Sequence, residues 1–310
     1  MISKVFQEPK DFSDILPADW VNHHLWVRAY RMLHVTPEIF DKGTITRDFF
    51  NVKIVLFYGK IKYHISDPPK VESSKPGEIV KKLASIKPVE TSEGGYILFI
   101  HKFEDNEPEI KKKIDEIVGL FIAINGLSNV YEYLFDEIIN VKENTTTGFS
   151  YIVPNPFWFK IPDLSDGRLK LIRSSYEKIS QADNILLSLR WFNEGNRKIA
   201  FDAFIPLWIA LETLVRAQGK KVVNKINENL ACCYGISNEE AANRFRIGYI
   251  YGLRKKIFHN GEILPIHTDL INYMIGIYLD ILFYFLGIKI EKRAELILQQ
   301  SEYLKRFLKL

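Results

Sequence analysis

The feature that most constrains the fold of this chain is a change in hydrophobic pattern near residue 165. Before it, short β-rich runs are separated by turn-forming residues, whereas after it strand signals stop and apolar residues recur at helical spacing. The chain has 310 residues, which is enough for two domains. We therefore predict an α+β domain over residues 1–165, followed by an all-α helical bundle over residues 166–310.

The two halves predict different elements. Strands are expected within residues 52–65, as two runs split by Gly59, and at residues 96–103, 131–141 and 149–153. Residues 107–127 have the apolar spacing of a helix, and residues 66–87 predict a loop with one short helix. In the second half, helices are expected at residues 169–192, 202–218, 220–234, 238–260, 265–287 and 291–308.

Two features bear on where the protein resides. The apolar stretch over residues 271–288 has Asp280 in its middle, and a carboxylate at the bilayer centre costs about 2.5–3.5 kcal/mol. We therefore expect a buried helix there and no membrane association. The start of the chain lacks an apolar signal-peptide core, and Cys232 and Cys233 are adjacent, so they bridge only with strain. Both observations predict a cytoplasmic protein with reduced cysteines.

Common cofactor and metal motifs are missing from the sequence. It contains no phosphate-binding G-x-x-x-x-G-K-[ST], no dinucleotide-binding G-x-G-x-x-G, no H-E-x-x-H and no G-x-S-x-G. Two cysteines are too few for a four-cysteine zinc site. We accordingly expect neither a cofactor nor a metal.

The most informative segment is FRIGYIYGLRKKIFHNGE, residues 245–262. Asn260 and Gly261 form a helix-stop signal, which places His259 in the last helical turn. On a continuous helix, Arg254 lies within an apolar stripe and His259 at its margin, and a cation framed by apolar residues is no ordinary surface charge. Nine basic and three acidic residues lie between Arg216 and Lys256, a net charge of +6 against +4 for the whole chain. The excess indicates a phosphate-bearing partner, the alternative being a solvated basic surface.

The helix before this segment contributes a further charge. Residues 203–215 are apolar almost all round, and Glu212 is their only charged residue. Glu212 either pairs with Arg216 one turn later or reaches across the bundle to Arg254 or His259.

Three passages make the second half resemble a HEPN domain of the Apea-like branch: FIPLWIALETLV at residues 204–215, the helix through Cys232 and Cys233, and YGLRKKIFHNGE at residues 251–262. The last has the R-x-x-x-x-H signature, with Arg254 and His259 in the two defining places. The resemblance implies a metal-independent endoribonuclease that dimerises, with the Arg and His of both chains in a shared cleft. It also implies a role in defence or toxin–antitoxin systems, with the first domain as sensor. Lys255 departs from the Asn, Asp or His common in active members.

The residues themselves fit that chemistry. RNA cleavage without a metal needs a base for the 2′-hydroxyl proton and a cation for the charge developing on phosphate. We assign His259 as acid–base and Arg254 as phosphate clamp, with a supporting set of Glu212, Lys255, Asn260 and Tyr251. Because Arg254 and His259 are about 140° apart on an ideal helix, they converge only through the reach of arginine or through a second chain. The alternatives are a non-catalytic RNA-binding module and a nucleotide sensor with the same fold.

The apolar faces of two helices predict a homodimer. On a continuous 238–260 helix, one stripe would face the chain's own core, namely Ala242, Phe245, Tyr249, Leu253 and Ile257. A second stripe would be left exposed, namely Ile247, Ile250, Tyr251 and Phe258. On the 265–287 helix, the surplus apolar residues are Ile271, Tyr278, Leu282 and Tyr284. Monomers seldom expose patches of this kind, so we expect a homodimer through both helices, disrupted by Ile250→Glu.

Overall fold

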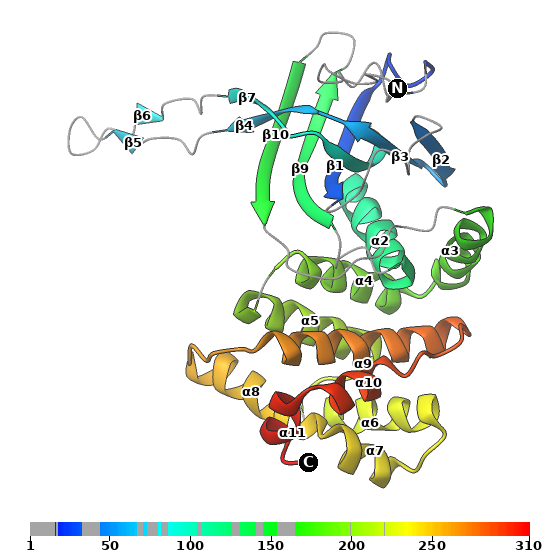
Figure 1. Cartoon of the computed structure of the whole chain (residues 1–310), viewed down its shortest axis with the longest axis vertical. Coiled ribbons are helices and arrows are strands. Elements are labelled where there is room, and N and C mark those ends of the chain that lie inside the picture. Colours follow the sequence, from blue (N-terminus) through cyan, green and yellow to red (C-terminus); the bar gives the residue numbers. More distant parts are fainter. Residues whose placement is uncertain are drawn as a thin grey trace, which may run out of the picture. The chain divides into compact units, whose positions relative to one another are not determined.

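A computed structural model describes residue 16 and residues 18–32, 44–66, 71–72, 80–81, 86–103, 107–125, 131–140, 145–153, 165–198, 200–219 and 221–310. The chain forms two compact units, and Figure 1 shows strands in the first and helices in the second. Unit 1 comprises Met1–Ile114 and Gly126–Asp163, and unit 2 comprises Asp115–Asn125 and Leu164–Leu310. The architecture is therefore an antiparallel sheet region followed by a helical region.

Unit 1 is built on an antiparallel six-stranded sheet. Its strands are β1 (His24–Met32), β2 (Ile45–Phe49), β3 (Val52–Gly59), β8 (Gly94–Lys102), β9 (Tyr131–Asn140) and β10 (Thr145–Val153), in the order β10-β9-β1-β8-β3-β2. Two further antiparallel pairs join β4 (Lys62–Ser66) to β7 (Ile86–Glu90) and β5 (Val71–Glu72) to β6 (Val80–Lys81). The predicted strands are present, and Gly59 ends β3 as expected. The short helix predicted within residues 66–87 falls partly outside the described residues, and the described part forms strands.

The sequence analysis missed β1, a central strand of the sheet. Almost every residue of β1 is buried, so the strand lacks the alternating pattern of a half-exposed one. Its polar interruption, Arg28, is fully buried and forms a bidentate pair with Asp136 on β9: Nε lies 2.6 Å from Oδ1 and Nη2 lies 2.7 Å from Oδ2. A charge in a strand interior thus reflects a cross-strand partner that the sequence does not reveal.

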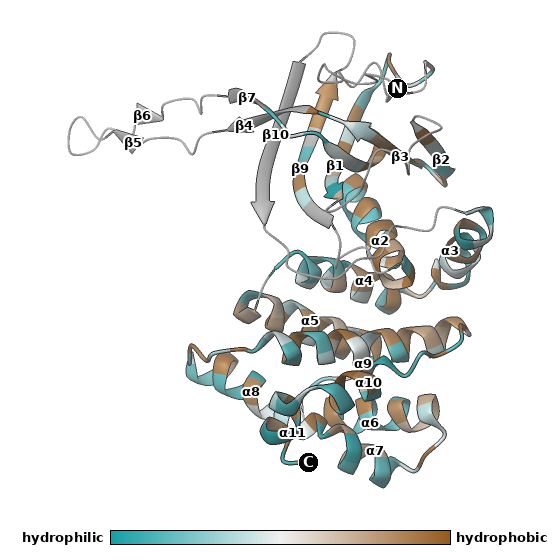
Figure 2. Ribbon diagram, in the orientation of Figure 1, coloured by the Kyte–Doolittle hydropathy of each residue, from teal (hydrophilic) through white to brown (hydrophobic). Residues whose placement is uncertain are grey.

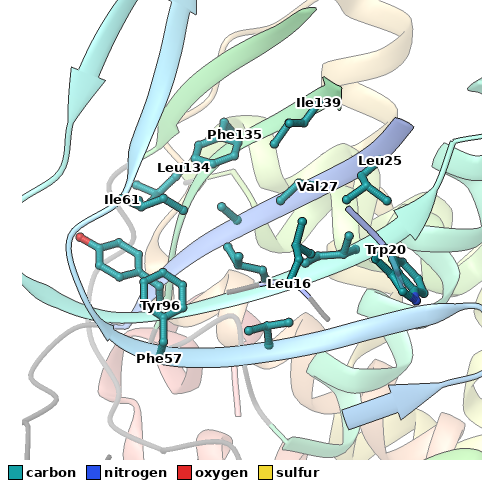
Figure 3. Packing of buried hydrophobic residues seen from close by; sticks show 14 residues of the cluster. Leu16, Trp20, Leu25, Val27, Phe57, Ile61, Tyr96, Leu134, Phe135 and Ile139 are labelled. Atoms are coloured by element: carbon teal, nitrogen blue, oxygen red, sulfur yellow. The ribbon is translucent and has the colours of Figure 1, made fainter. Parts of the chain in front are cut away.

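One face of this sheet carries the core drawn in Figure 3. Residues two apart on each strand point to the same side, so Leu25 and Val27 of β1 join Tyr96 of β8 and Phe57 of β3 in one cluster. The rings of Phe57 and Tyr96 stack with centroids 5.4 Å apart. Burying such aromatic and aliphatic side chains is the main stabilising contribution to unit 1.

Unit 2 contains the C-terminal part of α2 (Glu107–Asn125) and the helices α3 to α11. These are α3 (Asp166–Ile179), α4 (Asp183–Asn196), α5 (Ala200–Leu214), α6 (Lys221–Tyr234), α7 (Asn238–Phe245), α8 (Ile247–Asn260), α9 (Thr268–Leu286), α10 (Arg293–Gln300) and α11 (Glu302–Leu308). Polar contacts tie α2 to this unit, since Tyr176 donates to Glu116 at 3.2 Å and Asn193 donates to Asp115 at 3.1 Å. The predicted 107–127 helix is therefore shared between the two units.

Three predicted long helices are each two helices in the structure. The 169–192 helix divides into α3 and α4, the 238–260 helix into α7 and α8, and the 291–308 helix into α10 and α11. The second division occurs at Arg246, whose φ of 50° is left-handed. The third occurs at Ser301, whose extended backbone starts α11 while its Oγ accepts from the Leu304 N–H. The helical spacing of apolar residues continues through all three breaks, so periodicity alone predicted one helix in place of each pair.

The break at Arg246 corrects the predicted faces of α8. Ile247 and Ile250, assigned to an exposed stripe, are 1% and 0% exposed, whereas Tyr249, assigned to the core, is 38% exposed. A left-handed residue reorients the helix that follows it, so helical angles counted from α7 do not carry into α8. On α9, Ile271, Tyr278 and Leu282 are also buried, so they leave no apolar surface. Of the apolar residues proposed for a dimer surface, Phe258 and Tyr284 are exposed.

Helix α9 lies in the interior of unit 2. It is long and apolar enough by composition to cross a membrane, and its apolar residues are brown in Figure 2. Most of its residues are nevertheless buried against other helices of the unit, including α5, α6 and α10. This burial matches the core helix predicted from Asp280.

Asp280 in the middle of α9 receives the start of α10. Its Oδ1 accepts from the Arg293 N–H at 3.1 Å, and its Oδ2 accepts from the Ala294 N–H at 3.0 Å and from the Tyr234 hydroxyl at 2.6 Å. One turn earlier, Gly276 makes room for this approach, because a Cβ there would lie 3.0 Å from the Ala294 nitrogen. Burial raises the pKa of Asp280 above its ordinary value, although the three donors oppose that shift.

Candidate functional site

The candidate site lies on α8 and α5, both within unit 2. Helix α8 ends at Asn260, and Gly261 adopts a left-handed backbone with φ 64° and donates its N–H to the Lys256 carbonyl. His259 consequently occupies the last turn, as the helix-stop signal predicted. Ile247 and Ile250 bury the first turn of α8, whereas Lys255, Lys256, Phe258 and His259 are exposed. The helix is thus anchored at its start and presents its charged end to solvent.

Arg254 and His259 meet within one chain. The Nη1 atom of Arg254 lies 3.3 Å from Nε2 of His259, although the two residues are five positions apart. The length of the arginine side chain bridges the angular separation that the helical wheel predicts. A second chain is therefore not required to bring the two groups together, in contrast to one of the two routes considered from the sequence.

The chemistry of the two groups fixes which donates and which accepts in this contact. A guanidinium nitrogen carries hydrogens and donates only, so Nε2 of His259 has to be the acceptor. The Arg254 donor engages the lone pair of Nε2, so a general base at this position has to release that hydrogen bond before it takes a substrate proton.

Glu212 of α5 supplies the counter-charge to Arg254. Its Oε1 lies 3.8 Å from Nη2 of Arg254, and both side chains are largely buried, at 17% and 19% exposed. Of the partners weighed from the sequence, the structure pairs Glu212 with Arg254, while Arg216 instead donates to Asn184. The Glu212–Arg254 pair thus links the apolar helix α5 to the charged end of α8.

The site contains polar atoms without hydrogen-bond partners. Buried atoms of this kind among the described residues include Nε of Arg254, Oε1 of Glu212 and Nε1 of Trp208. Trp208 lies one turn before Glu212 on α5, and its ring is 5.9 Å from that of Tyr251 on α8. An unpaired buried polar atom costs about 1–3 kcal/mol, so the Arg254–Glu212 pair is less well satisfied than a structural ion pair such as Arg28–Asp136.

The other supporting residues divide between the site and its surroundings. Lys255 Nζ lies 5.6 Å from the ring centre of Tyr251, which puts both at the edge of the site. Asn260 donates to Glu262 at 2.8 Å, a contact that engages its side chain outside the Arg254–His259 pair. Within the residues that the structure describes, no cluster of His, Cys, Asp or Glu has the arrangement of a metal site.

One residue here has a contact that sequence reasoning did not assign. The guanidinium of Arg254 lies over the ring of Phe258, 4.7 Å from its centroid. The helical wheel placed Phe258 in a dimer stripe, because it treated the aromatic ring as apolar surface alone. The spacing Arg254–Phe258, four residues on one helix, is the signal that reveals a cation–aromatic pair.

Comparisons of the chain with protein-family models, with curated proteins and with solved structures find no match. The function is therefore argued from the site.

Proposed function

We propose that this protein is a metal-independent endoribonuclease of HEPN type, in which Arg254 and His259 cleave RNA. The observation that carries the proposal is the 3.3 Å contact between Arg254 Nη1 and His259 Nε2 at an exposed, basic helix end. The R-x-x-x-x-H resemblance supports it from the sequence. The HEPN assignment of the helical unit belongs to the same proposal.

In the proposed reaction, the ribose 2′-oxygen attacks the adjacent phosphorus while His259 Nε2 takes the 2′-hydroxyl proton. The phosphorus–O5′ bond breaks, and the leaving 5′-oxygen receives a proton from imidazolium or water. Arg254 binds two phosphate oxygens through its planar fork and stabilises the charge developing on them. The products are a 2′,3′-cyclic phosphate and a 5′-hydroxyl end.

Lys255 supports a second candidate, a non-catalytic RNA-binding module of the same fold. It stands where active members of the resembled family often have Asn, Asp or His, and it is exposed beside the Tyr251 ring. In this alternative the basic end of α8 binds phosphates without cutting. A nucleotide-sensing module would use the same cations on a smaller ligand.

The proposal includes the homodimer, the cytoplasmic location and the defence or toxin–antitoxin role that were expected from the sequence. Because Ile247 and Ile250 are buried in the chain's own core, a dimer surface on α8 has to use other residues. Ile250→Glu would disturb the fold before it disturbed an interface, so oligomeric state is better measured on the wild-type chain by light scattering.

The deciding experiment incubates purified protein with end-labelled RNA in EDTA. Wild type should cut, whereas His259→Ala should lose about 10²–10⁴-fold in rate, the usual contribution of acid–base catalysis. Arg254→Ala should lose cleavage and also bind RNA more weakly. His23→Ala and Lys221→Ala remove an exposed histidine and an exposed lysine elsewhere and serve as matched controls.

Three results would contradict the proposed mechanism: cleavage by His259→Ala at the wild-type rate, 5′-phosphate products, or loss of cleavage in EDTA that magnesium restores. Binding of RNA without cleavage by wild type would favour the RNA-binding module instead. Circular dichroism of each variant shows whether a loss of activity comes with a loss of fold.

A further inference from the structure

Phe258 is one of the most exposed large apolar residues in the part of unit 2 that the structure describes. Its side chain is 53% exposed, against 38% for Tyr249 on the same helix. Residues 249 and 258 are nine positions apart, so they lie on roughly opposite sides of α8, about 180° apart. A single exposed apolar residue is common on protein surfaces. What distinguishes Phe258 is that its ring packs against the Arg254 guanidinium.

The ring of Phe258 is in contact with the proposed catalytic group. The Arg254 guanidinium lies 4.7 Å from its centroid, and the same guanidinium is 3.3 Å from His259. A second aromatic–cation pair, Tyr251 with Lys255, lies on the same side of the helix at 5.6 Å. Interleaved aromatic rings and cations are typical of surfaces that bind single-stranded nucleic acid, where bases stack and phosphates pair with cations.

Charge and the limited apolar area both favour a nucleic acid over an apolar partner on this surface. Arg254, Lys255 and Lys256 follow one another, and His259 completes a cationic end of α8. Ile247 and Ile250, which would extend an apolar face along α8, are buried, so this helix presents no continuous apolar face to a lipid bilayer. An exposed aromatic ring among cations fits a flat base with its flanking phosphates.

We propose that Phe258 is a base-binding residue, on which an unpaired base next to the scissile phosphate stacks while Arg254 holds that phosphate. This inference rests on the proposed function and adds a selectivity to it. A base inside a duplex has both faces covered by its neighbours, so the ring binds a nucleotide only where the RNA is single-stranded or looped. The site therefore selects unpaired RNA through Phe258.

Binding is measured separately from cleavage to test this. The probe is a 2′-fluoro-substituted oligonucleotide, which lacks the attacking hydroxyl, carrying one 2-aminopurine as a reporter of stacking. Single-stranded, fully paired and single-abasic forms are compared by fluorescence anisotropy. The proteins are wild type, Phe258→Leu, Phe258→Trp and, as an exposed aromatic on the far side of α8, Tyr249→Leu.

Phe258→Leu should weaken binding of the single strand about tenfold, within the range seen for loss of one base–aromatic stack. Phe258→Trp should restore the affinity, and Tyr249→Leu should match wild type. Binding of the duplex should be the same for all four proteins. The 2-aminopurine fluorescence should be quenched by wild type and by Phe258→Trp, and not by Phe258→Leu.

An equal loss of affinity by Phe258→Leu for single-stranded, paired and abasic probes would overturn the inference, because Phe258 would then act only by supporting Arg254. Binding of wild type to anionic phospholipid vesicles, lost in Phe258→Leu, with no effect on RNA would also overturn it. If wild type cleaves RNA but Phe258→Leu binds normally, the inference fails and the proposed function stands. If the probe stacks on Phe258 but no RNA is cut, the proposed function fails and the base site stands.

Discussion

Unit 2 contains two charged side chains, one buried and one half-buried, with opposite surroundings. Asp280, on α9, is 1% exposed and accepts three hydrogen bonds, all at 3.1 Å or less. Arg254, on α8, faces its carboxylate partner at 3.8 Å, and its Nε has no hydrogen-bond acceptor. A buried charge is stable only when its partners replace the lost water. The first arrangement is complete by itself, whereas the second leaves hydrogen-bonding capacity for a ligand such as a phosphate.

The satisfaction of its partners therefore distinguishes Asp280 from Arg254, the charge that we propose to be functional. Asp280 joins three elements, α6, α9 and α10, through the Tyr234 hydroxyl and two backbone N–H groups that are fixed at the start of α10. Arg254 contacts side chains only, namely Glu212, Phe258 and His259, and each of these can adjust to a bound molecule. Three predictions test this contrast.

The largest expected effect is the difference in stability between a variant at Asp280 and a variant at His259. Asp280→Ala leaves the Tyr234 hydroxyl and two helix N–H groups without an acceptor, so the free energy of unfolding should fall by about 3–5 kcal/mol. His259→Ala removes an exposed side chain and should change the free energy of unfolding by about 0.5 kcal/mol or less. Urea denaturation followed by circular dichroism measures both. A comparable loss of stability in the two variants would break the contrast.

A smaller effect is expected at Glu212. Glu212→Gln keeps the shape of the side chain but removes the charge that competes with phosphate for Arg254. RNA should therefore bind about three- to tenfold more tightly, while kcat falls because Arg254 is less firmly oriented. Anisotropy with the 2′-fluoro probe gives the affinity, and initial rates give kcat. Weaker binding by Glu212→Gln would show that the carboxylate supports the site and does not compete for it.

The smallest effect concerns pH. Because burial raises the pKa of Asp280, the folded protein binds this proton more tightly than the unfolded chain does. The contribution of this carboxyl to the free energy of unfolding is therefore fully present below the ordinary pKa of about 4 and declines as the pH rises through the raised value. The stability difference between wild type and Asp280→Asn should fall over that range and then become constant. A difference that grows with pH there would mean that the three donors outweigh burial.

The sequence predicts much of the fold because hydrophobic period and turn signals are local. Such signals predict the helical unit, the end of β3 at Gly59 and the end of α8 before Gly261. Arg246 defeats this reasoning, because a left-handed arginine has no local signature, and it reverses the assigned burial of Ile250 and Tyr249. Strand β1 was missed for a related reason, since Asp136, which neutralises Arg28, is over one hundred residues away.

Part of the candidate site could also be predicted from the sequence, because its signals are local. Arg254 and His259 share one helix, so their spacing and the stop signal place them without knowledge of the tertiary fold. The partner of Glu212 required the packing of α5 near α8, since from sequence a local pair with Arg216 and a pair across the bundle with Arg254 or His259 were equally plausible. The role of Phe258 was missed because its ring was treated as apolar surface alone. A ring four residues from an arginine can also pack against the guanidinium.

Gly276 and Asp280 on α9 determine where another helix packs against this apolar helix. A hydropathy average treats Asp280 as one unfavourable residue and ignores Gly276 altogether, yet these two positions admit the backbone of α10 and bind its first N–H groups. A small residue followed one turn later by a carboxylate thus forms a position at which the N-terminus of another helix can bind. In a long apolar segment, the polar interruption marks where the rest of the chain docks, and here it assigns α9 to a protein interior instead of to lipid.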